Sequence, residues 1–188
     1  MSRWEPNARG RLEQAALELY RERGFDQTTV AEIAERAGLT ERTFFRYFTD
    51  KREVLFWGQG ALQEIYVSTI ADAPDSAAPI EAVAAALEAA APVFHGRREL
   101  ARQRQAVIAA NPGLQERELL KRASLASAMA DALRQRGVTE PAASLAAEAG
   151  VIAFKTAYAR WVAEPDRQDL PALIRESFDQ LKVLTAGG

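Results

Sequence analysis

The sequence has no cysteine and a single histidine, His95. Without cysteine there is no disulfide, no thiolate nucleophile and no cysteine-ligated zinc site. One histidine leaves a serine–histidine or cysteine–histidine mechanism little to draw on. No cluster of metal ligands stands out, and the GQG at Gly58 to Gly60 is too short for a nucleotide-binding motif. We therefore expect no enzymatic activity, no metal site and no cofactor.

Long apolar runs are also missing. None approaches the ~20 residues that a membrane helix needs, and Met1 to Pro6 lack the apolar stretch of a signal peptide. The 188 residues are 48% hydrophobic and 27% charged, which is normal for a soluble globular chain of one domain or two small ones. Because the absence of cysteine also fits a reducing compartment, we expect a cytoplasmic protein without a membrane partner.

Strand signals are scarce, whereas helical periodicity runs almost throughout the chain. A first helix is expected from about Ala8 to Arg23, where Gly24 ends it. Thr29 and Glu32 form a capping box, in which the hydroxyl and the carboxylate satisfy free N–H groups at a helix start. The sequence therefore predicts a short second helix directly after the first.

Two further helix starts follow the break at Gly38. Thr40 is expected to cap a third helix from Glu41 to about Phe48. The run Asp50-Lys51-Arg52-Glu53 is another start signal, and it predicts a long fourth helix that continues toward Ile70.

The second half of the chain is rich in alanine and follows a Pro/Ala/Ser/Asp linker, Ala73 to Pro79. Its helices are separated by four predicted breaks: Pro92 to Gly96, Asn111 to Gly113, Gly137 to Pro141, and Glu164 to Pro171. Together with the N-terminal helices, this pattern predicts an all-α fold of about nine helices.

The segment GLTERTFFRYFTDK, Gly38 to Lys51, holds four aromatic residues in five positions, interleaved with basic side chains. Two short helices joined by a glycine-containing turn and braced by an earlier helix are typical of a helix-turn-helix. At 100° per residue, Phe44 and Phe48 point inward together with Leu39. Tyr47 lies on another face, where its hydroxyl can reach a phosphate. The rings therefore divide between core and nucleic-acid surface.

Charge supports DNA binding only weakly. The formal net charge of the chain is −2, so the whole-chain charge gives no hint of nucleic acid. Residues 1–52 contain ten Lys/Arg and nine Asp/Glu, a net charge of +1. Binding would therefore depend on where the cations are placed and on doubling through a dimer.

The stretch from about Arg9 to Leu55 resembles the TetR family of bacterial transcription regulators, through the element T-x-x-x-I-A-x-x-A-G-x-T-x-x-T-F-F-R-Y-F-x-D-K from Thr29 to Lys51. The resemblance implies an all-helical homodimer that usually represses. Residues 1–52 would be the helix-turn-helix DNA-binding domain, and residues 53–188 the effector-binding and dimerisation domain.

The resemblance also implies roles for nine residues at double-stranded operator DNA. Thr29 would begin the second helix against the phosphate backbone, Arg46 would lie nearer the flank, and the others divide between phosphates (Thr40, Tyr47, Lys51) and base edges (Glu41, Arg42, Thr43, Phe45). For Glu41 two readings remain open. It either accepts from a cytosine amino group or is a first-turn carboxylate favoured by the helix dipole.

Two apolar stripes run along the helix expected between Pro141 and Glu164. One carries Val151 and three rings, Phe154, Tyr158 and Trp161; the other is made of alanines: Ala146, Ala149, Ala153 and Ala157. A helix apolar over so much of its circumference has more than one neighbour. We expect the alanine side to allow close helix approach across a homodimer formed by the last two helices, and the ring side to face its own domain. Ordinary core within one chain is the other reading.

Basic residues near the only histidine suggest an effector site. His95 is either a polar group in a pocket or an exposed loop residue, and Arg98 and Arg102, spaced i, i+4, either clamp a carboxylate or phosphate or form a solvated face. The segment from Arg97 to Gly137 also looks like the C-terminal domain of mycofactocin-type TetR regulators, which resemble acyl-CoA sensors. This second resemblance implies an apolar tunnel ending near basic groups, with the following ligand-binding residues: Phe94, His95, Arg98, Arg102, Phe154, Tyr158 and Trp161.

The combined expectation is a ligand-responsive DNA-binding regulator. It would be a repressor released from a palindromic operator by a small apolar anionic effector such as a fatty acyl-CoA. The alternative is a helical small-molecule-binding protein without a DNA role.

Overall fold

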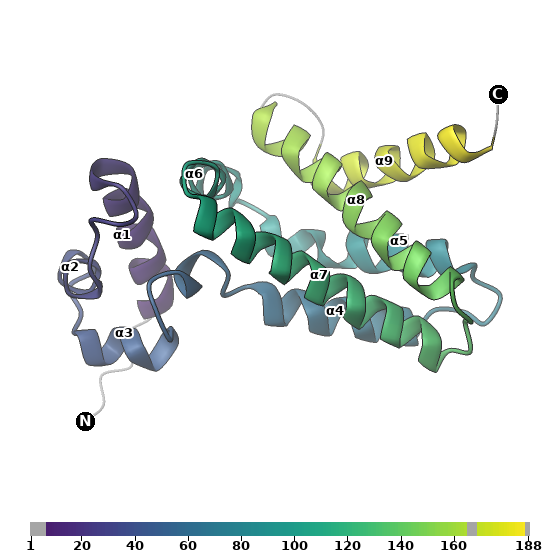
Figure 1. The fold of residues 1–188 in the computed structure, drawn as a ribbon, viewed down its shortest axis with the longest axis horizontal. Coiled ribbons are helices and arrows are strands. Elements are labelled where there is room, and N and C mark those ends of the chain that lie inside the picture. The colour runs from purple at the N-terminus through teal and green to yellow at the C-terminus, as the bar shows by residue number, and fades with distance from the viewer. Residues whose placement is uncertain (1–6, 165–168, 187–188) are drawn as a thin grey trace. The chain divides into compact units, whose positions relative to one another are not determined.

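The computed structural model describes residues 7–164 and 169–186, and these residues are helical with no strand (Figure 1). The all-α prediction of about nine helices is confirmed. In chain order the elements are α1 Ala8–Arg23, α2 Val30–Arg36, α3 Glu41–Tyr47, the 3-10 helix η1 Glu53–Leu55, α4 Gln59–Ala71, α5 Pro79–Ala90, the 3-10 helix η2 Ala91–Phe94, α6 Arg98–Ala109, α7 Pro112–Gln135, α8 Ala142–Ala163 and α9 Leu170–Thr185. Residues 165–168, within the last predicted break, and the N-terminal Met1 to Pro6 lie outside the described residues. None of the described helices is both long and apolar enough to span a bilayer.

The described chain divides into two compact units. The first contains the residues up to Trp57 together with Leu100–Glu118, and the second contains Gly58–Glu99 and the residues from Leu119 onward. The sequence-based boundary after residue 52 placed 100–118 in the C-terminal half. In the structure this segment supplies Val107, Ile108 and Leu114 to the hydrophobic core of the first unit.

The head, α1 to α3, follows local sequence signals closely. Gly24 has φ 87° and ends α1 in a backbone conformation that favours glycine. Thr29 and Glu32 make both hydrogen bonds of the capping box at the start of α2, and the Thr40 side chain accepts from the backbone N–H of Thr43 at the start of α3. These predicted caps are confirmed.

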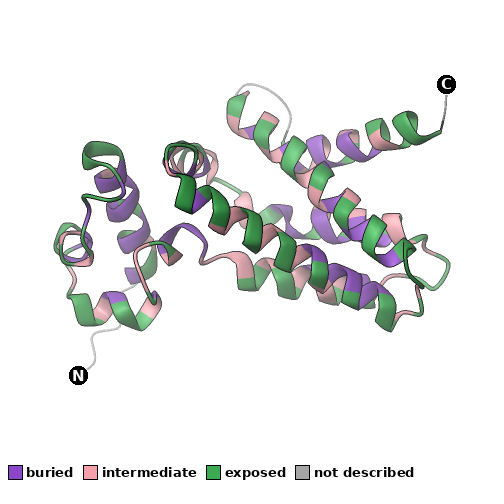
Figure 2. Ribbon diagram, in the orientation of Figure 1, coloured by how far each residue is buried: buried purple, intermediate pink, exposed green. Residues whose placement is uncertain are grey.

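The core of the head is closed by the inner side of α3. Phe44 is fully buried and Phe48 is nearly so, and half-buried Leu39 packs against the same cluster, as the helical spacing predicts. Figure 2 shows how buried and exposed residues alternate along α1 and α3. This inner side holds α3 in place and leaves its outer side free for a ligand.

The fourth helix differs from the prediction. The chain after α3 forms η1, capped by the Asp50 carboxylate, which accepts from the backbone N–H groups of Arg52 (2.7 Å) and Glu53 (3.0 Å). Helix α4 begins only at Gln59. Three consecutive residues after Glu53, starting at Val54, are all buried. Because successive residues of an α-helix point about 100° apart, one face of a regular helix could not bury all three, and the expectation of a continuous helix from Lys51 was wrong.

The second unit is built around α5, which packs against α4, α8 and α9. The alanine stripe of α8 faces inward: Ala153 and Ala157 are almost fully buried within the chain. A Cβ at Gly150 would lie only 2.3 Å from Cγ1 of Val83 on α5. The small residues therefore allow close approach to α5 of the same chain, and their assignment to a dimer contact is corrected.

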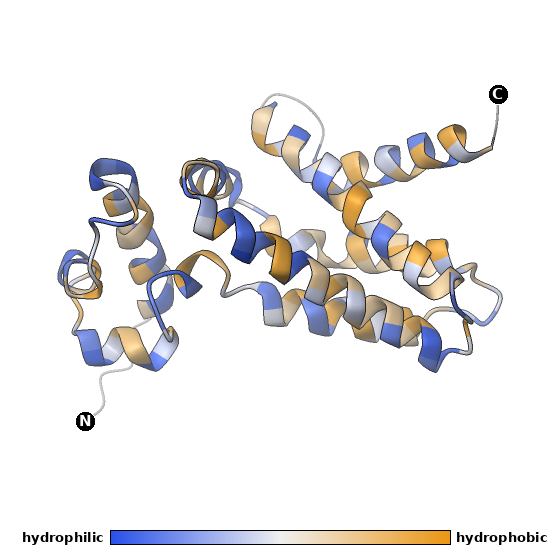
Figure 3. Ribbon diagram, in the orientation of Figure 1, coloured by the Kyte–Doolittle hydropathy of each residue, from blue (hydrophilic) through white to orange (hydrophobic). Residues whose placement is uncertain are grey.

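Other apolar side chains of α8 and α9 are exposed. They are Leu145 (66%), Ile152 (57%), Val183 (67%) and Leu184 (81%). Figure 3 shows hydrophobic residues recurring along both helices. Such side chains are a surface through which two copies can associate.

Candidate nucleic-acid interface and effector site

The outer side of α3 presents four exposed side chains: Glu41, Arg42, Phe45 and Arg46. Phe45 is 54% exposed, and its ring meets the buried Phe44 ring edge-on at a centroid distance of 5.4 Å. The ring is thereby supported from below while it projects outward. Arg42 makes no hydrogen bond or ion pair with the described residues, so its guanidinium is available to a ligand.

The hydroxyls at the start of α3 are partly engaged with each other. Thr40 Oγ1 accepts from the Thr43 backbone N–H (3.2 Å) and lies 3.0 Å from Thr43 Oγ1. Thr40 is exposed and Thr43 is half-buried. Thr40 can therefore offer its hydroxyl to a neighbouring group at this end of the helix.

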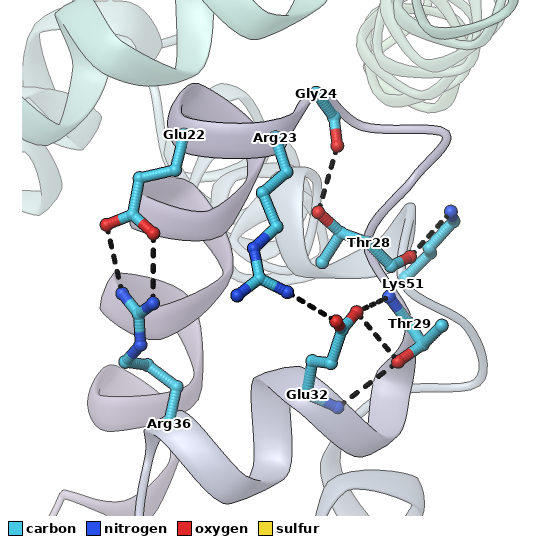
Figure 4. A network of polar contacts seen from close by, with 8 residues as sticks. All are labelled: Glu22, Arg23, Gly24, Thr28, Thr29, Glu32, Arg36 and Lys51. Atoms are coloured by element: carbon cyan, nitrogen blue, oxygen red, sulfur yellow. Dashed lines mark hydrogen bonds and ion pairs between the residues drawn. The ribbon is translucent and has the colours of Figure 1, made fainter.

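At the start of α2, Thr29 is exposed but committed to its capping box (Figure 4). Its hydroxyl donates to Glu32 Oε2 (2.9 Å) and accepts from the Glu32 backbone N–H (3.2 Å). The backbone N–H of Thr29, followed by its hydroxyl, lowers the pKa of Glu32, with a smaller contribution from Arg23. The lowered pKa means that Glu32 stays ionised to a lower pH than an ordinary glutamate, which favours the closed cap.

Lys51, predicted to contact a phosphate, is engaged within the first unit. Its Nζ donates to the backbone carbonyls of Phe25 (2.8 Å), Thr28 (2.8 Å) and Asp26 (3.2 Å), and Figure 4 shows it directed at Thr28. An ammonium group has three donors, and all three have carbonyl partners. Lys51 therefore ties the segment after α3 to the loop between α1 and α2.

Two arginines of α1, Arg9 and Arg11, reach the helix-turn-helix and were missed in the sequence. Arg11 Nη2 donates to the carbonyl of Ala37 and approaches that of Gly38 at 3.5 Å. Gly38 itself has φ 66°, and a Cβ there would lie 2.8 Å from Arg11 Nη2. Arg9 lies over the ring of Tyr47. No local pattern marks either arginine, because the contacts join residues more than 25 positions apart.

Two arginines of the segment Leu100–Glu118, Arg104 and Arg117, contact η1. Arg104 Nε donates to the Leu55 carbonyl (2.6 Å), and its Nη1 lies 3.0 Å from Glu118 Oε1. Arg117 Nε donates to Glu53 Oε1 (2.7 Å). These part-buried contacts join η1 to α6 and α7 within the first unit.

In the second unit, four rings form an aromatic cluster: Phe94, Phe154, Tyr158 and Trp161. Phe94, at the end of η2, lies 5.7 Å from Phe154 and Tyr158 and 6.2 Å from Trp161. The α8 rings thus face their own domain, as predicted. Trp161 is buried and the other three are half-buried.

The basic residues predicted beside these rings divide into two groups. The Arg98 guanidinium carbon lies 5.1 Å from the centre of the Trp161 ring. His95 is exposed at the end of η2, and Arg102 is exposed and belongs to the first unit. Of the predicted basic residues, the structure therefore brings Arg98 to the aromatic cluster.

Family models match most of the chain. The model of bacterial regulatory proteins of the tetR family matches residues 13–56, and the model of the MftR C-terminal domain matches residues 77–185. A curated relative, the HTH-type transcriptional regulator TcmR of Streptomyces glaucescens, is 36% identical over 81 residues, which are 43% of this chain and 36% of TcmR. The match thus spans about a third of that relative's length.

Solved structures share the fold. The complex of SmeT with triclosan has a TM-score of 0.65 at 20% identity, covering 94% of this chain and 90% of SmeT; SmeT is the repressor of the multidrug efflux pump SmeDEF of Stenotrophomonas maltophilia. FadR of Bacillus subtilis with stearoyl-CoA has a TM-score of 0.63 at 21% identity, covering 92% and 96%. FadR of Thermus thermophilus with lauroyl-CoA has a TM-score of 0.55 at 23% identity, covering 92% of both chains. The chain is thus a member of the TetR family of bacterial transcriptional regulators, with a C-terminal domain of the MftR type.

Proposed function

We propose that this regulator is a repressor that binds a near-palindromic operator as a homodimer and leaves it when an apolar effector with an anionic end binds. The observation that carries the DNA half of the proposal is the outer side of α3. Arg42, which pairs with no described residue, and the supported exposed ring of Phe45 stand on a helix whose opposite side is buried in the core.

On the operator, Arg42 reads a base and Tyr47 and Thr40 hold phosphates. Arginine pairs in bidentate fashion with the O6 and N7 of guanine, and an aromatic ring suits the methyl group of thymine. We therefore assign guanine to Arg42 and a thymine methyl to Phe45. The two readings of Glu41 both remain, since it is exposed at the first turn of α3. Lys51 is not in the phosphate set, because its donors are occupied.

The dimer would form through the exposed apolar side chains of α8 and α9. Leu145 and Ile152 are seven positions apart and so lie on one side of α8, away from the buried alanines. Val183 and Leu184, near the end of α9, are the most exposed large hydrophobic side chains among the described residues. A two-helix contribution from each copy gives a four-helix interface.

For the effector, the aromatic cluster and Arg98 supply the two kinds of contact needed. Half-buried rings can part around an acyl chain, and a guanidinium can meet a carboxylate or phosphate. Two proteins that share the fold were solved with acyl-CoAs: FadR of Bacillus subtilis with stearoyl-CoA and FadR of Thermus thermophilus with lauroyl-CoA. These bound ligands and the MftR-type domain support a fatty acyl-CoA as the effector class.

The signal would travel along α6. Helix α6 starts at Arg98, whose guanidinium lies at the aromatic cluster, and farther along it supplies Arg104 and Val107 to the first unit. A shift of α6 would therefore move η1, which is the next element after α3. An effector that moves a two-state balance from 1:99 to 99:1 needs about 5.5 kcal/mol of preference for the released state.

Titration with acyl-CoAs tests the effector class. Long-chain acyl-CoAs, free fatty acids and unacylated coenzyme A would be added while tryptophan emission and release from operator DNA are followed. We expect acyl-CoAs to change both signals, and Arg98→Ala to weaken their effect without weakening DNA binding. A response to neutral or cationic aromatic compounds alone would contradict the acyl assignment and leave the repressor assignment standing.

A further inference from the structure

Two arginines from different helices gather around one ring at the end of α3. The guanidinium carbon of Arg46 lies 5.0 Å from the centre of the Tyr47 ring, and that of Arg9, in the first turn of α1, lies 5.5 Å from it. Arg9 is also 5.1 Å from the centre of the Trp57 ring. Arg46 Nη2 donates to the Tyr47 hydroxyl at 3.3 Å. We call Arg9, Arg46 and Tyr47 the arginine–tyrosine site.

The charge of this site is not balanced within the described chain. Neither Arg9 nor Arg46 forms an ion pair with a described residue, whereas Arg23, Arg36 and Arg52 of the same unit all do. Two like charges near one ring repel each other, and an anion between or beside them would relieve that repulsion. The site is therefore suited to an anionic ligand.

The stacking of both arginines on aromatic rings also leaves guanidinium N–H donors available to an anion. A guanidinium that lies over a ring uses its face, while its five N–H groups point outward in its own plane. Both side chains are exposed, and the rings limit the rotamers they can sample. The donors are thus held in place before a ligand arrives, which reduces the entropy lost on binding.

We propose that Arg9 is a phosphate-binding residue of the head and that it forms, with Arg46 and the Tyr47 hydroxyl, one site for a DNA backbone phosphate. This inference rests on the proposed operator binding. It adds a residue that lies before the stretch 13–56 matched by the DNA-binding family model. The bracing alternative, in which Arg9 only holds α1 against Tyr47 and Trp57, predicts a loss of stability and no change in the ionic part of DNA binding.

Salt dependence separates the two, because phosphate contacts release counterions and bracing contacts do not. A duplex of random sequence suffices, since phosphate contacts carry no sequence information. The affinity of the full-length chain would be measured from about 50 to 200 mM salt for wild type, Arg9→Gln and Arg9→Lys. Arg21→Gln is the matched control: Arg21 is exposed near the other end of α1 and has no ion pair or ring contact in the described chain.

A plot of log affinity against log salt has a negative slope, and each phosphate contact contributes about 0.9 to its steepness. We expect Arg9→Gln to make the negative slope shallower by about 1.8 per dimer, from two contacts of about 0.9 each. Between about 1 M and about 0.1 M salt this costs the variant a roughly 60-fold gain in affinity that the wild type makes. Arg9→Lys and Arg21→Gln should keep the wild-type slope. Thermal melts of each variant report folding. An unchanged slope for Arg9→Gln overturns the assignment, while wild-type binding then still stands. If the wild type itself binds no duplex, the proposed operator binding fails with it.

Discussion

Replacing Lys51 by methionine should destabilise the head and leave the salt dependence of DNA binding unchanged. Methionine keeps an unbranched side chain of similar length and removes the ammonium. The change deletes hydrogen bonds from Nζ to three backbone carbonyls, at 2.8, 2.8 and 3.2 Å, and a cation–π contact with the Phe25 ring at 4.5 Å. It leaves the loop between α1 and α2 without its tie to the segment after α3.

The magnitude follows from the partners. A hydrogen bond to a charged group contributes about 1.5–3 kcal/mol net. The three bonds share one half-buried ammonium, and water can partly replace it at the carbonyls. We therefore expect a loss of about 2–4 kcal/mol rather than the full sum. Arg52→Met is the control. Among the described residues the Arg52 guanidinium pairs with Asp50 alone, at the surface, and exposed pairs contribute about 0–1 kcal/mol.

Urea unfolding followed by circular dichroism gives the change in free energy, and amide hydrogen exchange shows whether the loss is centred on the α1–α2 loop and α2. The salt slope of DNA binding is measured on the same samples under conditions where the variant is folded. We expect a lower unfolding midpoint and an unchanged slope. A wild-type midpoint combined with a slope reduced by about 1.8 per dimer would show that Lys51 contacts phosphate and would refute the reasoning.

Three other substitutions test separate parts of the molecule. Gly38→Ala should destabilise the chain by at least about 1–2 kcal/mol, because the positive φ of Gly38 disfavours a side chain. Gly60→Ala, in an open part of a helix, should stabilise it by up to about 1 kcal/mol. Equal melting temperatures for the two variants would contradict this. On a panel of single-base operator variants, Arg42→Ala should relax preference at one position by about 1–3 kcal/mol per half-site, and Tyr47→Phe should weaken all sequences alike; a uniform loss for Arg42→Ala would make it a phosphate contact. Arg117→Gln should weaken effector-driven release by about 0.5–2 kcal/mol of coupling while effector-free DNA affinity stays the same; an unchanged release curve would exclude this route.

Local chemistry predicted much of the head. The caps at Thr29 and Thr40 and the inward pair Phe44 and Phe48 depend on residues within four positions of one another, and such relations are visible in sequence. The Asp50 start signal was also real, since its carboxylate caps η1. The structure after Asp50 depends on the burial of consecutive apolar residues from Val54 onward. A helix start signal carries no information about that burial.

Contacts between distant segments could not be predicted in the same way. Lys51 finds carbonyls 23–26 positions away, and nothing in its own segment distinguishes this from a phosphate contact. The alanine stripe indicated close approach but not its partner, and Val83 on α5 supplies that partner within the chain. Arg9 reaches Tyr47 only because the fold brings the first turn of α1 to the end of α3. These features depend on tertiary packing.

Selection of bound fragments from a random DNA pool tests the central claim, that two copies of this chain read one operator, most directly. We expect enrichment of a near-palindromic motif whose half-sites lie about one helical turn apart, roughly 34–36 Å, or a pair of such motifs for two dimers. Within each half-site a guanine should lose its enrichment when Arg42 is replaced by alanine. Recovery of an unenriched pool, or of a single half-site without a symmetric mate, would contradict the claim.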